Sequence, residues 1–250
     1  MADATALVTG AGNGLGRAIA QALAAAGYRV ILAGRRAEPL AETAELIGGN
    51  CRIGQVDVAD PASVRRLAAE LADERISVLV NNAGVPGPVK PLVEIEAEEW
   101  DEVFAVNVRG MFLMCKAFLP PMIERGAGHV INLSSVSGKR PLALRTPYTA
   151  SKMAVLGLTN TLGAEVGPAG VQVNSLSPGP VRGPRMSRNF KLEAQRLGIT
   201  EADAEAAFAG RATLGRLVEE AEVGAAVVAM LQLSGLHCAD IDLSAGMVAR

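Results

Sequence analysis

Short β-type runs alternate with longer helical segments along the whole chain, and this alternation limits the possible folds more than any other feature. The candidate strands cover 6–9, 29–33, 51–56, 78–81, 129–134, 171–176 and 240–243. The segments of helical period between them cover 15–26, 37–47, 61–73, 97–123, 147–166 and 219–233. This order is typical of parallel strands joined by right-handed helical crossovers. The sequence therefore predicts a single α/β domain over residues 1–250, with about seven parallel strands and helices on both faces.

The composition fits such a sheet and disfavours several classes of protein. Half of the residues are hydrophobic, 20% are charged and the formal net charge is −2, which describes a folded protein rather than a disordered one. Aromatic residues make up only 3%, so the core must consist of aliphatic side chains, as in buried parallel sheets. With a sequence pI of about 5.8 and few aromatic stacking platforms, nucleic acid is not an expected partner.

Cysteine and histidine usage indicates the compartment. The three cysteines are Cys51, Cys115 and Cys238. Their odd number and wide spacing are typical of reduced thiols in cytosol, and His129 and His237 alone predict no metal site. We expect no membrane helix, because no apolar run approaches the roughly 18 residues it needs, and residues 1–5 are too short and polar for a signal peptide. A cytoplasmic location is predicted.

A glycine-rich turn follows the first candidate strand and leads into a helix. Residues 9–16 read TGAGNGLG. Glycine permits positive φ and close approach of the backbone to a pyrophosphate, whose charge the helix NH groups and dipole attract. The segment does not satisfy G-x-G-x-x-G, since Gly10 and Gly12 would require a glycine at Leu15. It predicts a phosphate-binding turn, with a purely structural turn as the alternative.

Two arginines, rather than an acidic residue, follow the second candidate strand. A carboxylate that binds ribose is expected about 20 residues beyond the turn. Gly34 stands there, followed by Arg35 and Arg36. Two guanidinium groups can bind a 2′-phosphate that a carboxylate would repel, so the sequence favours NADP(H) over NAD(H). Solvated surface arginines are the alternative interpretation.

Further motifs give the chain a resemblance to the short-chain dehydrogenase/reductase family over almost its whole length. The segment at 81–84 reads NNAG, Tyr148 and Lys152 form Y-x-x-x-K, and the glycine turn fits the family's T-G-x-x-x-G-x-G. The resemblance implies a Rossmann-like, doubly wound parallel sheet and an NAD(P)-dependent oxidoreductase acting on a secondary alcohol or ketone. It also implies a homotetramer formed through the helices near 97–123 and 147–166.

The resemblance assigns catalytic roles to four residues. The family's serine usually lies 13 residues before its tyrosine, which selects Ser135; strand alternation would turn the neighbouring Ser134 to the opposite face. Tyr148 would be the acid/base, and Lys152, on the same helical face, would stabilise its phenolate and hold the nicotinamide ribose. Ser135 would donate to the substrate oxygen. Asn107 would hold a water in the proton path, the alternative being a buried polar residue that bonds its own helix.

The same resemblance implies a set of cofactor contacts at the carboxyl ends of the strands. They are Gly10, Asn13, Gly14, Leu15, Gly16, Arg35, Arg36, Asp57, Val58, Asn81, Ala83, Gly84, Tyr148, Lys152, Pro178, Gly179 and Val181. The chain departs from the family at Gly183, where a threonine that contacts the carboxamide is common. That hydrogen bond is therefore in doubt.

The segment 180–216 shows no strand pattern but offers two short helical patterns, and it is predicted to be a substrate lid. It follows a strand's carboxyl end, where ligands bind in α/β sheets, and Met186 and Phe190 are its expected apolar contacts. The basic residues near the expected pocket are Arg182, Arg185, Arg188, Lys191 and Arg196 against Glu193 alone, with Lys139, Arg140 and Arg145 before Tyr148. They favour an anionic small-molecule substrate such as a hydroxy acid, sulfonate or acyl thioester. Contacts to cofactor phosphate or to solvent are the alternative.

The leading hypothesis is thus an NADP(H)-dependent oxidoreductase, with a 3-oxoacyl reductase as one candidate. An NAD-dependent catabolic dehydrogenase is the nearest alternative. A regulator that binds cofactor without turnover is disfavoured because Asn107, Ser135, Tyr148 and Lys152 are all present. An epimerase or dehydratase of nucleotide-linked sugars usually needs a larger C-terminal region than this chain offers.

Overall fold

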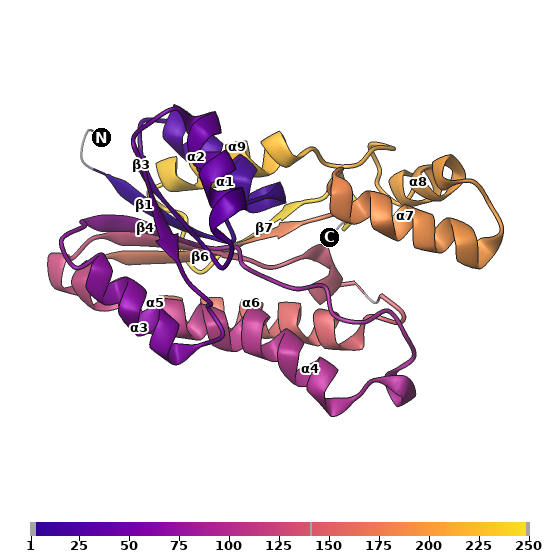
Figure 1. The fold of residues 1–250 in the computed structure, drawn as a ribbon, viewed down its shortest axis with the longest axis horizontal. Coiled ribbons are helices and arrows are strands. Elements are labelled where there is room, and N and C mark those ends of the chain that lie inside the picture. The colour runs from indigo at the N-terminus through magenta and orange to yellow at the C-terminus, as the bar shows by residue number, and fades with distance from the viewer. Residues whose placement is uncertain (1–3, 141, 249–250) are drawn as a thin grey trace.

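The computed structural model describes residues 4–140 and 142–248, without the side chain of Arg185, and shows a twisted sheet between two layers of helices (Figure 1). The strands are β1 (Thr5–Thr9), β2 (Arg29–Gly34), β3 (Cys51–Gln55), β4 (Ile76–Asn81), β5 (Gly128–Leu133), β6 (Val171–Pro178) and β7 (Asp240–Leu243). The helices are α1 (Gly14–Ala25), α2 (Ala37–Ile47), α3 (Pro61–Glu70), α4 (Ala97–Phe104), α5 (Gly110–Arg125), α6 (Thr146–Val166), α7 (Pro184–Leu197), α8 (Glu201–Ala209) and α9 (Glu220–Gln232).

The sheet has the order β3-β2-β1-β4-β5-β6-β7, and all its neighbouring strands are parallel. The direction of winding reverses between β1 and β4, which creates a crevice at the carboxyl ends of these strands. This arrangement confirms the predicted doubly wound α/β fold. Most predicted boundaries lie within two residues of the observed ones.

Each face of the sheet buries its own apolar core. Helices α1, α2 and α9 cover one face, and α3 to α6 cover the other (Figure 1). The first core contains Ile19, Leu32 and Val223, while the second contains Leu7 and Met114. Because both faces are covered, strands such as β1 are buried along their whole length, as parallel strands generally are.

The predicted helix over 97–123 is in fact interrupted. A π-helical turn at Ala105–Arg109 separates α4 from α5 and contains Asn107. The whole run Ala97–Arg125 is long and apolar enough to cross a membrane, so the expectation that no such run exists was wrong. Met114 and Phe118 of this run are nevertheless buried in the core beneath the sheet, where a soluble protein uses the same apolar length for packing.

Helices α7 and α8 lie beyond the end of the sheet at which β6 terminates (Figure 1). They enclose a small core of their own, formed by Phe190, Ala194, Ala204 and Leu217. One parallel bridge, Val181 to Val218, joins the two ends of this segment. We call residues 180–216 the lid segment.

Candidate active site

A cavity of about 1120 Å³ lies where the strands end and the lid segment begins. The sequence-predicted residues that line it are Gly10, Asn13, Gly14, Leu15, Gly16, Arg35, Arg36, Asp57, Val58, Ala83, Gly84, Ser135, Tyr148, Lys152, Pro178, Gly179 and Val181. Residues from seven separate stretches of sequence therefore converge on one space. Asn81 and Asn107 are not among its lining residues.

The glycine turn forms one wall of the cavity. Gly10 has φ of +67°, and a Cβ on Gly16 would overlap the Gly10 carbonyl oxygen and lie 2.6 Å from Nδ2 of Asn82. Only glycine fits both positions without displacing the backbone. Helix α1 begins at Gly14 with no side-chain cap and no acidic residue in its first turn. Its free NH groups and positive dipole end are thus suited to hold an anion such as a diphosphate.

Asn82, which sequence reasoning missed, ties this turn to the end of β4. The Thr9 hydroxyl accepts from the backbone NH groups of Asn82 (2.9 Å) and Ala83 (3.0 Å). The Asn82 amide in turn donates to the Thr9 carbonyl at 2.9 Å. Its position inside the NNAG motif was the available signal.

Asn81 belongs to the sheet rather than to the cavity, contrary to its predicted cofactor contact. Its amide donates to Oδ1 of Asn132 at 2.9 Å and to Sγ of Cys115 at 3.3 Å. Asn81 and Asn132 are paired residues of β4 and β5, and both are buried. The side chain therefore points into the core beneath the sheet.

The two serines after β5 both line the cavity, so strand alternation did not separate them. The reason is that β5 ends at Leu133, before either serine. Their hydroxyl groups still differ. The Ser134 hydroxyl donates to the Lys152 carbonyl at 2.8 Å, whereas the Ser135 hydroxyl accepts from the Ser137 backbone NH at 3.1 Å, which leaves its own proton for a ligand.

Tyr148 and Lys152 lie one turn apart on α6. The Lys152 ammonium is 5.8 Å from the centre of the Tyr148 ring and donates to the Leu133 carbonyl at 2.7 Å. Lys152 is only 5% exposed. A buried ammonium beside a phenol favours the phenolate electrostatically, so the pair suits proton transfer at the tyrosine oxygen.

Asn107 holds backbone instead of facing the cavity. Its Oδ1 accepts from the Val85 NH at 2.8 Å, and its Nδ2 donates to the Val85 carbonyl at 3.0 Å. Nδ2 also donates to Oγ of Ser151 on α6 at 3.0 Å. The role of holding a water stays a prediction, whereas the alternative of a bond within its own helix is wrong, because the side chain bonds Val85 and Ser151. Asn107 fixes the loop after Gly84 to α6.

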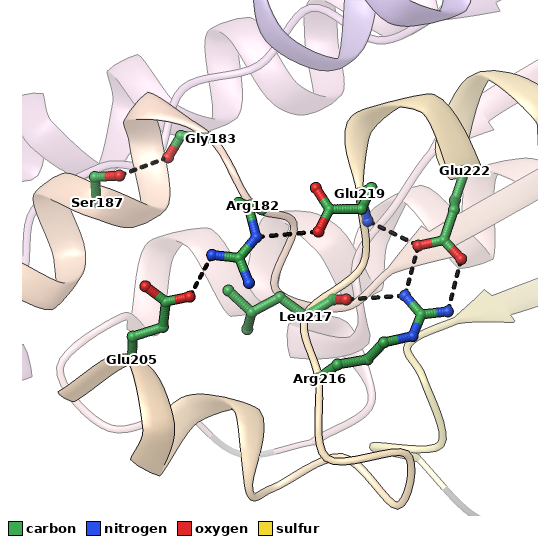
Figure 2. Close-up of polar contacts among 8 residues, drawn as sticks. All are labelled: Arg182, Gly183, Ser187, Glu205, Arg216, Leu217, Glu219 and Glu222. Atoms are coloured by element: carbon green, nitrogen blue, oxygen red, sulfur yellow. Dashed lines mark hydrogen bonds and ion pairs between the residues drawn. The ribbon is translucent and has the colours of Figure 1, made fainter. Parts of the chain in front are cut away.

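Several predicted substrate cations are used elsewhere. Lys139 is buried in ion pairs with Asp240 and Asp242 of β7. Arg182 pairs with Glu205 and Glu219 (Figure 2). These contacts involve acids far away in sequence, which the local charge pattern could not show. Arg188 and Lys191 do not line the cavity, and the Arg185 side chain lies outside the described part of the structure.

Other cations and one aromatic ring of the lid segment line the cavity. Arg196 and Arg211 belong to the lid segment and Arg140 and Arg145 precede α6; Arg196 pairs with Glu193, and Arg145 donates to the Pro86 carbonyl and to Oδ1 of Asn189. Met186 lines the cavity as predicted, but Phe190 is buried in the lid segment's own core. Phe208 takes the position expected for Phe190: its ring packs against Phe190 at a tilt of 59°, with ring centres 5.4 Å apart, and it lines the cavity.

The chain resembles several known proteins. The family described as short chain dehydrogenase matches residues 4–194. D-threitol dehydrogenase of Mycolicibacterium smegmatis is 42% identical over 178 residues, covering 69% of this chain and 68% of the relative. D-beta-hydroxybutyrate dehydrogenase of Rhizobium meliloti is 35% identical over 204 residues, covering 79% of each protein.

The fold comparison extends over nearly the whole chain. A variant of actinorhodin polyketide ketoreductase, solved with NADPH, has a TM-score of 0.93 and 30% identity and covers 98% of this chain and 97% of its own. The family supplies the cofactor class that the cavity's glycine turn and uncapped helix fit. The chain belongs to the short-chain dehydrogenase/reductase family and is an NAD(P)-dependent oxidoreductase of secondary alcohols or ketones.

Proposed function

We propose that the enzyme uses NADP(H) in preference to NAD(H). Arg35 and Arg36 carry this proposal: both line the cavity just beyond β2, both are exposed, and neither forms an ion pair with another residue in the described part of the chain. Two guanidinium groups without a carboxylate partner fit a 2′-phosphate. That the ketoreductase with the similar fold was solved with NADPH is consistent with this choice.

In the proposed reaction Tyr148 transfers the proton and Ser135 holds the reacting oxygen. Bound nicotinamide supplies or accepts the hydride. The Ser135 hydroxyl donates to the carbonyl or alcohol oxygen and stabilises the charge that develops on it. Tyr148 donates its phenolic proton to that oxygen during reduction and removes it during oxidation, and Lys152 stabilises the resulting phenolate. Asn107 acts as a positioning residue through Val85 and Ser151.

We propose an anionic alcohol or ketone as substrate, a 3-oxoacyl compound or hydroxy acid included. Arg140, Arg145 and Arg211 carry this part, because they line the cavity, where a carboxylate, phosphate or sulfonate could be bound. A neutral polyol is the competing class, since D-threitol dehydrogenase is among the relatives. Comparing kcat/KM for a 3-hydroxy acid and for a tetritol, in the parent and in Arg211→Gln, separates the two. A preference for the tetritol that survives in Arg211→Gln would refute the anionic substrate.

The cofactor experiment is a fluorescence titration with NADPH and NADH. The parent protein should bind NADPH more tightly by about tenfold or more, and Arg35→Ser and Arg36→Ser should lose most of that preference by weakening NADPH alone. Arg66→Ser, on the outer part of α3 and away from the cavity, is the matched control. Tighter binding of NADH by the parent would overturn the assignment and favour an NAD-dependent dehydrogenase.

We also propose a cytoplasmic homotetramer. Phe112 of α5 and Met153 of α6 are 47% and 52% exposed, and burial of such side chains between copies would be favourable. The three cysteines form no disulfide, as in a reducing compartment. Light scattering at micromolar concentration should report a tetramer, and Met153→Glu should shift it toward smaller species. A monomeric parent would remove the oligomer proposal.

A further inference from the structure

Glu220 places its carboxylate in the cofactor cavity beside the glycine turn. It is the first residue of α9 and lines the cavity. Its Oε1 lies 3.7 Å from the position that a Cβ on Gly14 would take and 2.5 Å from the position of a Cβ on Gly183. Any side chain at Gly183 would therefore meet this carboxylate. The glycine that departs from the family's usual threonine leaves the space that Glu220 uses.

An acid at this point faces the anion-binding end of the cavity. Helix α1 begins at Gly14, and its uncapped NH groups are the ones suited to the diphosphate of NAD(P). A charged carboxylate a few ångströms away would repel a bound diphosphate, and the repulsion is strong where water is displaced. Glu220 and the diphosphate therefore compete for the same positive potential.

The neighbouring charges do little to neutralise Glu220. Arg17 of α1 attracts it but is paired with Glu42 at 2.7 Å. Arg182, in the segment that precedes α7, is occupied by Glu205 and Glu219. On α9 itself, Glu222 is bound to Arg216 at 2.7 Å, and the Glu219 charge repels Glu220. In the described part of the chain no hydrogen bond or ion pair joins the Glu220 carboxylate to another side chain.

We propose that Glu220 is a cofactor-binding residue whose carboxylate takes up one proton from solvent when the diphosphate of NAD(P) binds against α1. The protonated group donates a hydrogen bond to a phosphate oxygen, so a repulsive contact becomes an attractive one. Burial already raises the pKa of Glu220 above its ordinary value, the nearby Glu219 charge adds to the increase, and Arg17 opposes it. The bound diphosphate raises it further. This inference rests on the family's use of NAD(P), and it adds a residue that the family motifs do not contain.

The expected consequence is cofactor binding that weakens as pH rises. Between the pKa of Glu220 in the free enzyme and its higher value in the complex, Kd should increase up to about tenfold per pH unit. ADP-ribose is the decisive probe, because it keeps the diphosphate but has neither a 2′-phosphate nor a nicotinamide. Calorimetry of ADP-ribose binding in two buffers of different ionisation enthalpy counts the protons taken up. NADH fluorescence titrations from about pH 6 to about pH 9 give Kd directly.

Two isosteric variants make the test specific. Glu220→Gln should take up no proton, should show a flat Kd across this range and should bind ADP-ribose about tenfold more tightly near pH 8. Glu219→Gln removes the same charge one residue away, outside the cavity lining. Because the Glu219 charge raises the pKa of Glu220, this variant should keep the proton uptake but shift it to lower pH. If Glu220→Gln folds poorly by circular dichroism, Glu220→Ala tests the same loss of charge, and the proton count on the parent needs no variant.

Two results would overturn the inference, and a third would contradict its premise. Proton uptake near zero in the parent, with Kd unchanged by Glu220→Gln, would show that the carboxylate turns away from the diphosphate and would overturn the inference. A Kd that depends on pH for NADH but not for ADP-ribose would also overturn the inference, because the proton uptake would then be coupled to the nicotinamide half of the cofactor. Failure of every variant to bind either nucleotide at any pH would instead contradict the cofactor class itself.

Discussion

The cavity has a floor and a lid that are held in place by different forces. We define the floor as the strand ends with their attached residues Thr9, Asn82, Ser135, Tyr148 and Lys152. Thr9, Ser135 and Lys152 are buried, and each of their side chains bonds to backbone, as the Lys152 ammonium does to the Leu133 carbonyl. The floor therefore cannot rearrange without disturbing the two large cores.

The lid segment is held in place by a much smaller core and by ion pairs. Its own core contains four buried apolar residues. Arg182 joins α8 to the start of α9 through two ion pairs (Figure 2), whose side chains are 35–52% exposed. Such pairs contribute little to stability in water. The groups proposed to perform the chemistry are thus fixed by the global fold, whereas Met186, Phe208 and Arg211 line the cavity from a segment able to open locally.

The largest expected effect comes from a substitution in the floor that lowers the reaction rate and hardly changes cofactor binding. Tyr148→Phe removes the transferable proton and keeps the ring, so kcat should fall by about a thousandfold or more. Binding of NADPH, measured by fluorescence, should change by less than about threefold, because the variant retains the Lys152 contacts to backbone. A variant with full turnover on a true substrate would exclude Tyr148 as the acid/base.

The second effect is on the stability of the floor. In Gly16→Ala the new Cβ would overlap the Gly10 carbonyl oxygen. Relieving this clash would displace the backbone of the turn or of the helix, so we expect the free energy of unfolding to fall by about 2 kcal/mol or more. Thermal unfolding should show a midpoint lower by about 4–8 °C. Gly48→Ala is the control: Gly48 has φ of +75° with open space around its Cβ position, so it should lose only the about 1 kcal/mol of left-handed backbone strain. Equal losses in the two variants would refute the steric argument.

The same contrast explains what could be predicted from the sequence. The floor follows from strand–turn–helix patterns and from motifs whose spacing is local, so residues such as Gly10, Ser135 and Tyr148 were placed at the cavity. Errors arose where long-range partners decide the role of a side chain. Lys139 meets acids about 100 positions later, and Asn107 reaches back to Val85.

In the lid segment almost every role depends on such contacts. The sequence predicted two short helical patterns, and α7 and α8 confirm them. It could not predict which face each helix buries, because both helices pack on each other and not on the sheet. Phe190 was therefore assigned to the cavity when Phe208 lines it. Glu220 was missed because nothing in its own neighbourhood shows that α9 begins beside Gly14.

Removing an ion pair of the lid segment should have a smaller effect, which is confined to that segment. Arg182→Met removes the bridge between α8 and α9 and should speed limited proteolysis within 180–216 by about threefold to tenfold, while global unfolding hardly changes. Arg196→Met is the matched control, because its partner Glu193 lies on the same helix and the pair bridges nothing. If the two variants are cleaved at the same rate, Arg182 does not hold the lid segment closed.

The smallest effect concerns the pair that anchors the start of α9. The Arg216 guanidinium binds Glu222 through two hydrogen bonds of 2.7 and 2.8 Å; together with the Glu219 backbone NH it lowers the pKa of Glu222 to about 2. A pKa lowered on folding stabilises the folded state above the unfolded value of about 4.3, and this contribution is lost as pH falls toward about 2. Because the two side chains are 47% and 36% exposed, screening by solvent limits this contribution. Glu222→Gln should therefore lower the unfolding midpoint at pH 7 by at most about 2 °C. The difference between parent and variant should shrink from about pH 4 downward. A difference that stays constant to pH about 2.5 would mean that Glu222 acts here through packing or helix capping and not through its charge.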